Sequence, residues 1–226
     1  MKKTLFGLMM ILSVLCLGLV SCSKDKDTDK EDELSKDIQN FVPDETLEQI
    51  IDMGMVINKG VDPPDMEGEY LASPYELIAT TVANDYSLGT IFSDYYFRLY
   101  DQDNDDLTIK LDYYNGGEQG SGLGGFISGD GKEFSVFIEV ESEYNGYEAT
   151  LLHVISGTMN TDGSIEDFYF TNYMLDNNGN DGGVWIENDE GRVLIDSDGE
   201  TPVTDYEFKS TKSTVNSVIP GAIKVK

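Results

Sequence analysis

Residues 94–114 read DYYFRLYDQDNDDLTIKLDYY, and apolar and polar side chains alternate in this stretch on both sides of an acidic turn. The segment 132–142, KEFSVFIEVES, repeats the alternation. A period of two places every second residue on one face of a β-strand, so each segment predicts strands with one buried and one solvated face. Tight turns are expected between the strands, because pairs such as Asn145-Gly146 supply the positive φ angles that hairpins require.

The same pattern predicts about ten strands in the central part of the chain. They are expected at residues 69–79, 94–101, 106–115, 122–128, 132–142, 146–157, 164–175, 183–187, 191–196 and 203–208. Since consecutive strands are joined by hairpins without helical crossovers, we expect an all-β fold, an antiparallel up-and-down barrel of roughly 8–10 strands. A two-sheet β-sandwich is the alternative. One short N-terminal helix is also expected, because Leu47, Ile50, Ile51 and Met55 recur at helical spacing.

The register of the strands predicts which side chains fill the barrel. A slip by one residue would bury charged groups such as Arg98 and Glu139, at a high cost in free energy. We therefore expect one alternating set to point inward: Phe97, Leu99, Leu107, Ile109, Leu111, Phe134, Val136, Ile138 and Val140. A barrel of this size holds at most one small ligand, so a site is expected at one mouth, beside loops 80–93, 115–122 and 176–183.

The N-terminus carries the pattern of a processed targeting segment. Lys2 and Lys3 precede an apolar run over residues 4–19, and the sequence LVSC at 19–22 ends it. The run is too short for a membrane-spanning helix and stops abruptly. This arrangement resembles the signal of bacterial lipoproteins, in which a small-residue motif precedes the cysteine that receives lipid. The resemblance implies lipidation at Cys22.

The sequence that follows, SKDKD at 23–27, resembles the charged export signals of Bacteroidetes-type surface lipoproteins. In that family, acidic residues near the cysteine direct the lipoprotein to the cell surface. The resemblance implies an outer-membrane lipoprotein of the cell envelope, exposed at the surface and attached to the membrane through the lipid anchor on Cys22. The body is similar to lipocalin-like and avidin-type barrels in architecture alone.

Five segments are expected along the chain. They are a signal peptide at 1–21, a lipidated cysteine with a disordered acidic tether at 22–40, a short helix with an extended lead-in at 41–67, the β-barrel domain at 68–209, and a C-terminal strand or tail at 210–226. The tether is expected to be disordered because it is dense in Asp, Glu and Lys and has no aromatic side chain to bury.

Charge and cysteine content exclude several classes of function. The chain of 226 residues holds 43 acidic and 15 basic residues, a formal charge of −28 at pH 7. Such a surface repels phosphate groups, so a nucleic acid is not expected as a partner. Cys16 would leave with the signal and Cys22 would carry lipid, so a disulfide, a cysteine nucleophile and a thiolate metal site are excluded.

Three motifs have weak functional readings. Asp101, Asp103 and Asp105 alternate as calcium ligands do, but Asp is also common in turns, so a solvated hairpin turn is preferred and no metal or cofactor is expected. His153 is the only histidine, and we expect a hydrogen-bonded structural role for it. Residues 120–125 match the G-x-G-x-x-G spacing, but strand character follows, so a flexible turn is expected in place of a dinucleotide site.

No pattern in the sequence singles out a catalytic or ligand-binding residue. The leading expectation is a non-enzymatic, lipid-anchored envelope protein whose β-barrel binds a small ligand or a protein partner. One alternative is a carbohydrate-binding module or a weak glycan hydrolase, because glycoside hydrolysis needs only two carboxylates. The other is a structural accessory subunit of an envelope complex.

Overall fold

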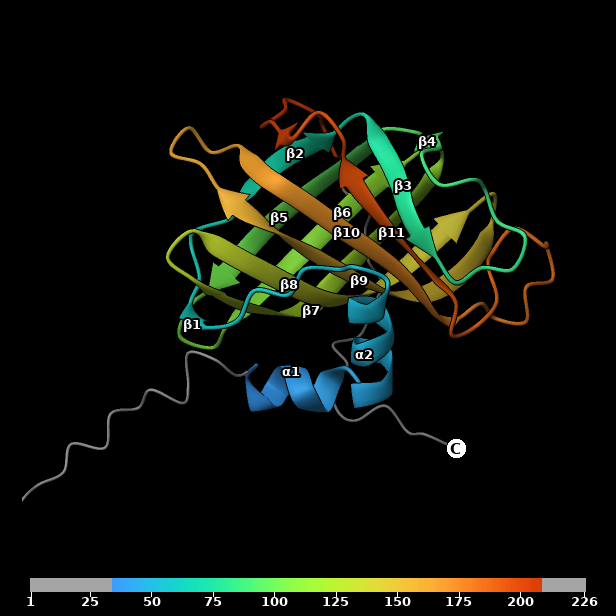
Figure 1. Cartoon of the computed structure of the whole chain (residues 1–226), viewed down its shortest axis with the longest axis horizontal. Coiled ribbons are helices and arrows are strands. Elements are labelled where there is room, and N and C mark those ends of the chain that lie inside the picture. Colours follow the sequence, from blue (N-terminus) through green and yellow to red (C-terminus); the bar gives the residue numbers. More distant parts are fainter. Residues whose placement is uncertain (1–33, 209–226) are drawn as a thin grey trace, which may run out of the picture.

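The computed structural model describes residues 34–208, so the predicted signal peptide, Cys22, the first part of the tether and the tail at 210–226 lie outside the described residues. Ten strands form one antiparallel sheet that curls on itself as a half-barrel, and β1 and β12 pair with it from the side (Figure 1). This confirms the predicted all-β antiparallel fold. The strands are β1 Val61–Asp62, β2 Gly68–Ala72, β3 Tyr75–Thr80, β4 Ile91–Phe92, β5 Tyr95–Asp103, β6 Thr108–Asn115, β7 Glu118–Asp130, β8 Glu133–Tyr144, β9 Tyr147–Met159, β10 Ile165–Asp176, β11 Gly191–Asp196 and β12 Glu200–Thr201.

Strands β5 to β11 follow one another in chain order, as the hairpin pattern predicts. The departure lies at the single strand expected over 69–79, which is two strands, β2 and β3, separated by Ser73 and Pro74. Proline has no N–H to donate, so a ladder of hydrogen bonds stops at this point. β2 pairs with β5 and β3 pairs with β11, so this short connection joins the two sides of the curled sheet.

The segment at 200–204 connects the two sides again. β12 pairs with β10, and the backbone then turns to β2, where Leu71 N donates to Pro202 O at 3.1 Å and Thr204 N donates to Glu69 O at 2.8 Å. The strand expected at 203–208 is therefore reduced to a bridge at Val203. This segment therefore bridges β10 and β2.

The strand expected at 183–187 is a loop. The side-chain amide of Asn180 takes the place of a neighbouring strand there: its Oδ1 accepts from Trp185 N at 3.1 Å, and its Nδ2 donates to Trp185 O at 2.8 Å. Such side-chain bonds to the backbone compete with strand pairing.

The predicted interior set is confirmed. Eight of its nine members are at most 1 % exposed, and Leu107 is half-buried and packs against the same core. Large aromatic side chains fill much of the remaining interior, among them Tyr70, Phe168 and Phe170. The register is therefore the one that keeps Arg98, Lys110 and Glu139 out of the core.

Two helices precede the sheet where one was expected. α1 is Lys36–Phe41 and α2 is Asp44–Asp52. Ser35 caps α1 by accepting from Ile38 N at 3.2 Å, and Ile38 is fully buried. Residues 34–40 thus belong to the folded body and not to the tether. None of the helices in 34–208 is long and apolar enough to cross a membrane.

The helices cover part of the outer face of the sheet, below the barrel in Figure 1. Ile38 and Ile50 form a second core there with Phe137, Leu152 and Val154 from β8 and β9. Both faces of these two strands are therefore buried, in contrast to the expected single buried face.

Candidate functional site

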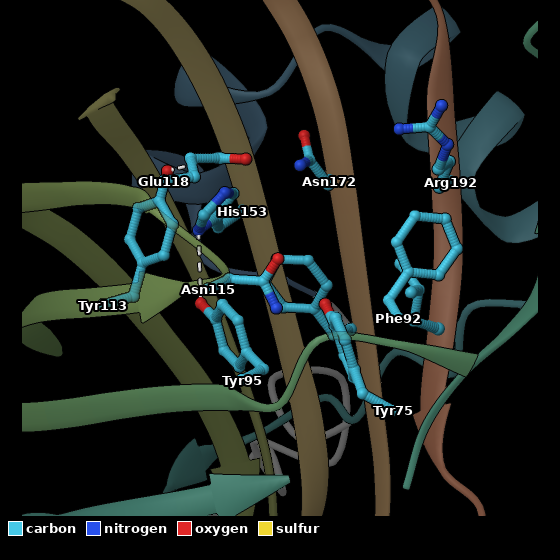
Figure 2. A pocket seen from close by; sticks show the side chains of 11 residues that line it. Tyr75, Phe92, Tyr95, Tyr113, Asn115, Glu118, His153, Asn172 and Arg192 are labelled. Atoms are coloured by element: carbon cyan, nitrogen blue, oxygen red, sulfur yellow. Dashed lines mark hydrogen bonds between the residues drawn. The ribbon is translucent and has the colours of Figure 1, made fainter. Parts of the chain in front are cut away.

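Eleven side chains enclose a cavity of about 80 Å³ at the end of the barrel where β6 turns into β7 and β10 leads to β11 (Figure 2). Two of the three loops expected to border a site, 80–93 and 115–122, contribute lining residues here, and loop 176–183 contributes none. Eight strands contribute to its wall: β3 to β7 and β9 to β11. The lining residues are Tyr75, Phe92, Tyr95, Tyr113, Asn115, Glu118, His153, Phe170, Asn172, Arg192 and Leu194.

A row of polar side chains crosses three adjacent strands on the wall of this cavity. Asn172 on β10 lies directly opposite His153 on β9 and opposite Arg192 on β11. Residues directly opposite one another in a sheet point to the same face, and here that face is the interior, because Phe170 and Leu194 are inward-facing neighbours. The row is unusual in a core that is otherwise aromatic and aliphatic.

His153 is fully buried, and burial lowers its pKa to about 3, so its imidazole is neutral near pH 7. Its Nδ1 lies 3.4 Å from the Tyr95 hydroxyl, which agrees with the expected hydrogen-bonded histidine. The rings of Tyr113 and Phe170 pack against the imidazole in edge-to-face arrangements, at centroid distances of 4.6 and 4.7 Å. Its second nitrogen, Nε2, is buried and has no partner among residues 34–208.

Asn172 presents a second buried atom without a partner. Its Oδ1 is shielded from solvent and accepts no hydrogen bond within the described part of the chain. A buried polar group that is left unpaired costs roughly 1–3 kcal/mol in stability. Two such atoms in neighbouring positions, His153 Nε2 and Asn172 Oδ1, therefore mark this wall of the cavity as energetically incomplete.

Glu118 opens β7 and places its carboxylate in the cavity. Tyr113 donates to Glu118 Oε1 at 2.6 Å, and the same hydroxyl lies 2.6 Å from Ser142 Oγ. Burial raises the pKa of Glu118 above its ordinary value, and the Tyr113 hydrogen bond and the charge of Arg192 act in the opposite direction. No cation of the described residues forms an ion pair with it.

The glycine-rich run makes room for this arrangement. Residues 120–125 lie within strand β7 and not in a flexible turn, so that expectation is wrong. A Cβ at Gly120 would lie 2.5 Å from Tyr113 Cε1, and one at Gly122 would lie 2.5 Å from the Ile138 side chain. The glycines therefore allow Tyr113 and Ile138 to pack closely on β7.

Arg192 is already paired. Its Nε donates to Asp85 Oδ2 at 2.8 Å and its Nη2 donates to Asp85 Oδ1 at 2.7 Å. Burial by itself would raise the pKa of Asp85, but the hydrogen bonds from Arg192 and Thr80 outweigh it and hold this pKa at about 2. The guanidinium also lies 5.6 Å from the centre of the Phe92 ring. Most of its charge is thus neutralised by Asp85.

The three candidate calcium ligands do not converge. Asp103 Oδ1 accepts from the backbone N–H groups of Asp105 and Asp106, at 2.9 and 3.1 Å, as an acidic residue in a turn does. Asp101 is paired instead with Lys110, whose Nζ lies 2.7 Å away. Across residues 34–208, no group of three or more His, Cys, Asp or Glu side chains is placed to hold a metal ion.

Glu118, Asn172 and Arg192 were missed by sequence reasoning. A usable signal was present in two of them, since Asn172 stands two residues after Phe170 and Arg192 two residues before Leu194, on the inward parity of their strands. Comparison with known family models, curated proteins and solved structures gives no match.

Proposed function

We propose that this protein is a non-enzymatic, lipid-anchored protein of the outer envelope that binds a small polar ligand in the cavity at the mouth of its barrel. The observation that carries the proposal is the pair of buried atoms without partners, His153 Nε2 and Asn172 Oδ1, on one wall of that cavity. A ligand that bonds to both would recover the free energy that the empty site loses.

The size of the cavity limits the ligand. The cavity volume of about 80 Å³ equals the volume that two to three water molecules occupy in liquid water. Only a few non-hydrogen atoms fit inside, so the ligand is either a very small molecule or the head group of a larger one that enters through the mouth. Aromatic walls with a few placed polar groups are the usual composition of such sites.

Glycan hydrolysis gains less support from this cavity. Acid–base hydrolysis of glycosides uses two facing carboxylates, and Glu118 is the one carboxylate in the described lining. The densely filled remainder of the barrel also suits a structural accessory role. The two unpaired atoms favour ligand binding over that role, because they belong to residues that line a cavity, unlike other unpaired atoms such as Ser156 Oγ.

His153 provides a direct test, because it is the only histidine of the chain. In full-length protein prepared without a histidine tag, its imidazole NMR signals report on the cavity alone. We expect titration with ethylammonium, acetate or acetamide to shift these signals with at least one of the three probes. If none of them moves the His153 signals at concentrations of about 100 mM, well above the millimolar range accessible to so few atoms, the proposal fails.

The anchor has its own test. Cys22→Ser is expected to abolish fatty-acid labelling and to release the protein from the membrane fraction, since the thiol is the only proposed site of lipid attachment. Cys16→Ser is the matched control, because Cys16 lies within the proposed signal and should be dispensable. Continued labelling of the Cys22→Ser protein would contradict the anchor.

A further inference from the structure

We infer that the ligand of the mouth cavity is a small organic ammonium ion, held by Glu118 and Asn172 within the aromatic walls. The inference rests on the proposed function and adds the chemical class of the ligand. Charge, ring geometry and the supply of acceptors support it separately.

The first argument is the balance of charge. Arg192, the only cationic side chain in the lining, is bound at two positions by Asp85, with both contacts under 2.9 Å. Glu118 has a single hydrogen bond, from Tyr113, and no ionic partner in the described structure. The charge that the cavity leaves uncompensated is therefore negative, which attracts a cation and repels a carboxylate or phosphate.

The second argument is the aromatic wall. Five rings line the cavity: Tyr75, Phe92, Tyr95, Tyr113 and Phe170. Four of them form a connected set, with Tyr95 at centroid distances of 5.3 Å from Tyr75, 5.7 Å from Tyr113 and 4.6 Å from Phe170. Faces of aromatic rings attract cations, and cages of such rings recognise organic ammonium groups.

The third argument is the supply of acceptors. An ammonium group has only donors, and the free acceptors on this wall are Glu118 Oε2 and Asn172 Oδ1. Figure 2 shows both side chains along the same side of the cavity, with His153 between them. His153 Nε2 is a further acceptor when the imidazole carries its proton on Nδ1, toward Tyr95.

The inference predicts a dependence on pH. An ammonium ion binds the ionised form of Glu118, so its affinity should rise with pH as the raised pKa of this group is passed. Burial raises the pKa of Tyr75, Tyr95 and Tyr113, and it lowers that of His153 to about 3, so none of these groups changes its charge together with Glu118. Arg192 is paired with Asp85.

The test compares the three probes on three proteins. Ethylammonium should shift the His153 signals with a millimolar Kd at pH 8, and acetate and acetamide should bind at least tenfold more weakly. In Glu118→Gln, ethylammonium binding should weaken at least tenfold and lose its pH dependence. Glu133→Gln, at an exposed position on β8, should behave as the unmodified protein.

Each result decides between the two proposals. Binding of acetate or acetamide in preference to ethylammonium would overturn the ammonium inference and leave a ligand-binding cavity in place. Equal ethylammonium binding by the Glu118→Gln protein would overturn the inference in the same way. Failure of all three probes would remove the proposed function as well. If Glu118→Gln does not fold, the pH profile of the unmodified protein still decides, since affinity that does not rise with pH between pH 4 and pH 8 contradicts the role of Glu118.

Discussion

Replacing His153 with leucine should change how stability depends on pH. In the folded protein, burial lowers the pKa of this imidazole to about 3, whereas in the unfolded chain it titrates near its ordinary value of about 6.5. Between these values the unfolded state binds a proton that the folded state does not. The stabilising contribution of neutral His153 is therefore fully present above pH 6.5 and is lost as the pH falls toward 3.

The size of this effect follows from the two pKa values. Between pH 7 and pH 5, linkage predicts a loss of about 2 kcal/mol in the free energy of unfolding from His153 alone. The raised pKa of Glu118 has the opposite effect on the free energy of unfolding: acidification favours the folded state, because Glu118 binds a proton more readily when folded than when unfolded. Since Glu118 is present in both proteins, the difference between the unmodified protein and His153→Leu isolates the histidine.

Urea unfolding followed by circular dichroism at pH 7 and pH 5 measures this difference. The unmodified protein should lose about 2 kcal/mol more than His153→Leu on acidification. Parallel behaviour of the two proteins would refute the reasoning. So would an NMR titration in which the folded-state imidazole has its midpoint near pH 6.5, because His153 would then be accessible to solvent and not buried.

Three further predictions concern the barrel, the acidic turn and the cavity wall. Ile109→Asp should unfold the domain, because a buried unpaired carboxylate costs several kcal/mol, which is about the whole stability of a domain. Thr108→Asp should be tolerated. Equal melting temperatures of the two variants would show that the faces of the strand are misassigned. A chelator should leave the melting temperature of the unmodified protein unchanged, and the melting temperature of Asp103→Ala should not respond to calcium. A calcium-dependent shift in melting temperature that this substitution removes would contradict the turn assignment. Asn172→Leu should raise the melting temperature by roughly 2–4 °C, the shift expected when loss of the unpaired atom stabilises the fold by about 1 kcal/mol. Asn58→Leu should lower the melting temperature, because Asn58 Nδ2 donates to Phe134 O at 2.9 Å. A fall in the melting temperature of both variants would assign Asn172 a structural role.

The parts of the fold that could be predicted are those governed by local alternation. Phe134, Val136 and Ile138 point inward because a strand has a period of two, and hairpins joined by short turns can pair only with their neighbours. The pairing of β2 and β3 with strands on opposite sides of the sheet could not be predicted in this way. The pairing of β3 with β11 joins residues such as Tyr75 and Asp196, which are more than a hundred residues apart, and local periodicity carries no information about such contacts.

The candidate site was hidden for a related reason. His153 lies on a strand with apolar side chains on both faces, because α1 and α2 cover the outer one, so its direction could not be read from the neighbouring residues. Asn172 and Arg192 have the inward parity of their strands, but a single polar residue on that parity does not show which other residues it meets. Their significance appears only when β9, β10 and β11 are paired in register.

Buried polar groups beside residues 200–204 and at the mouth have different surroundings, and the difference supports a binding role for the mouth. Asp196 Oδ2 accepts from Ser73 N at 3.1 Å and from Thr201 Oγ1 at 2.8 Å, so this carboxylate joins β12 to the start of β3, although its Oδ1 has no partner in the described structure. At the mouth, His153 Nε2 and Asn172 Oδ1 are also without partners among residues 34–208, and both side chains line the cavity. Unpaired polar atoms at a cavity are those that a bound molecule can reach and satisfy, so we expect a ligand to bind at the mouth.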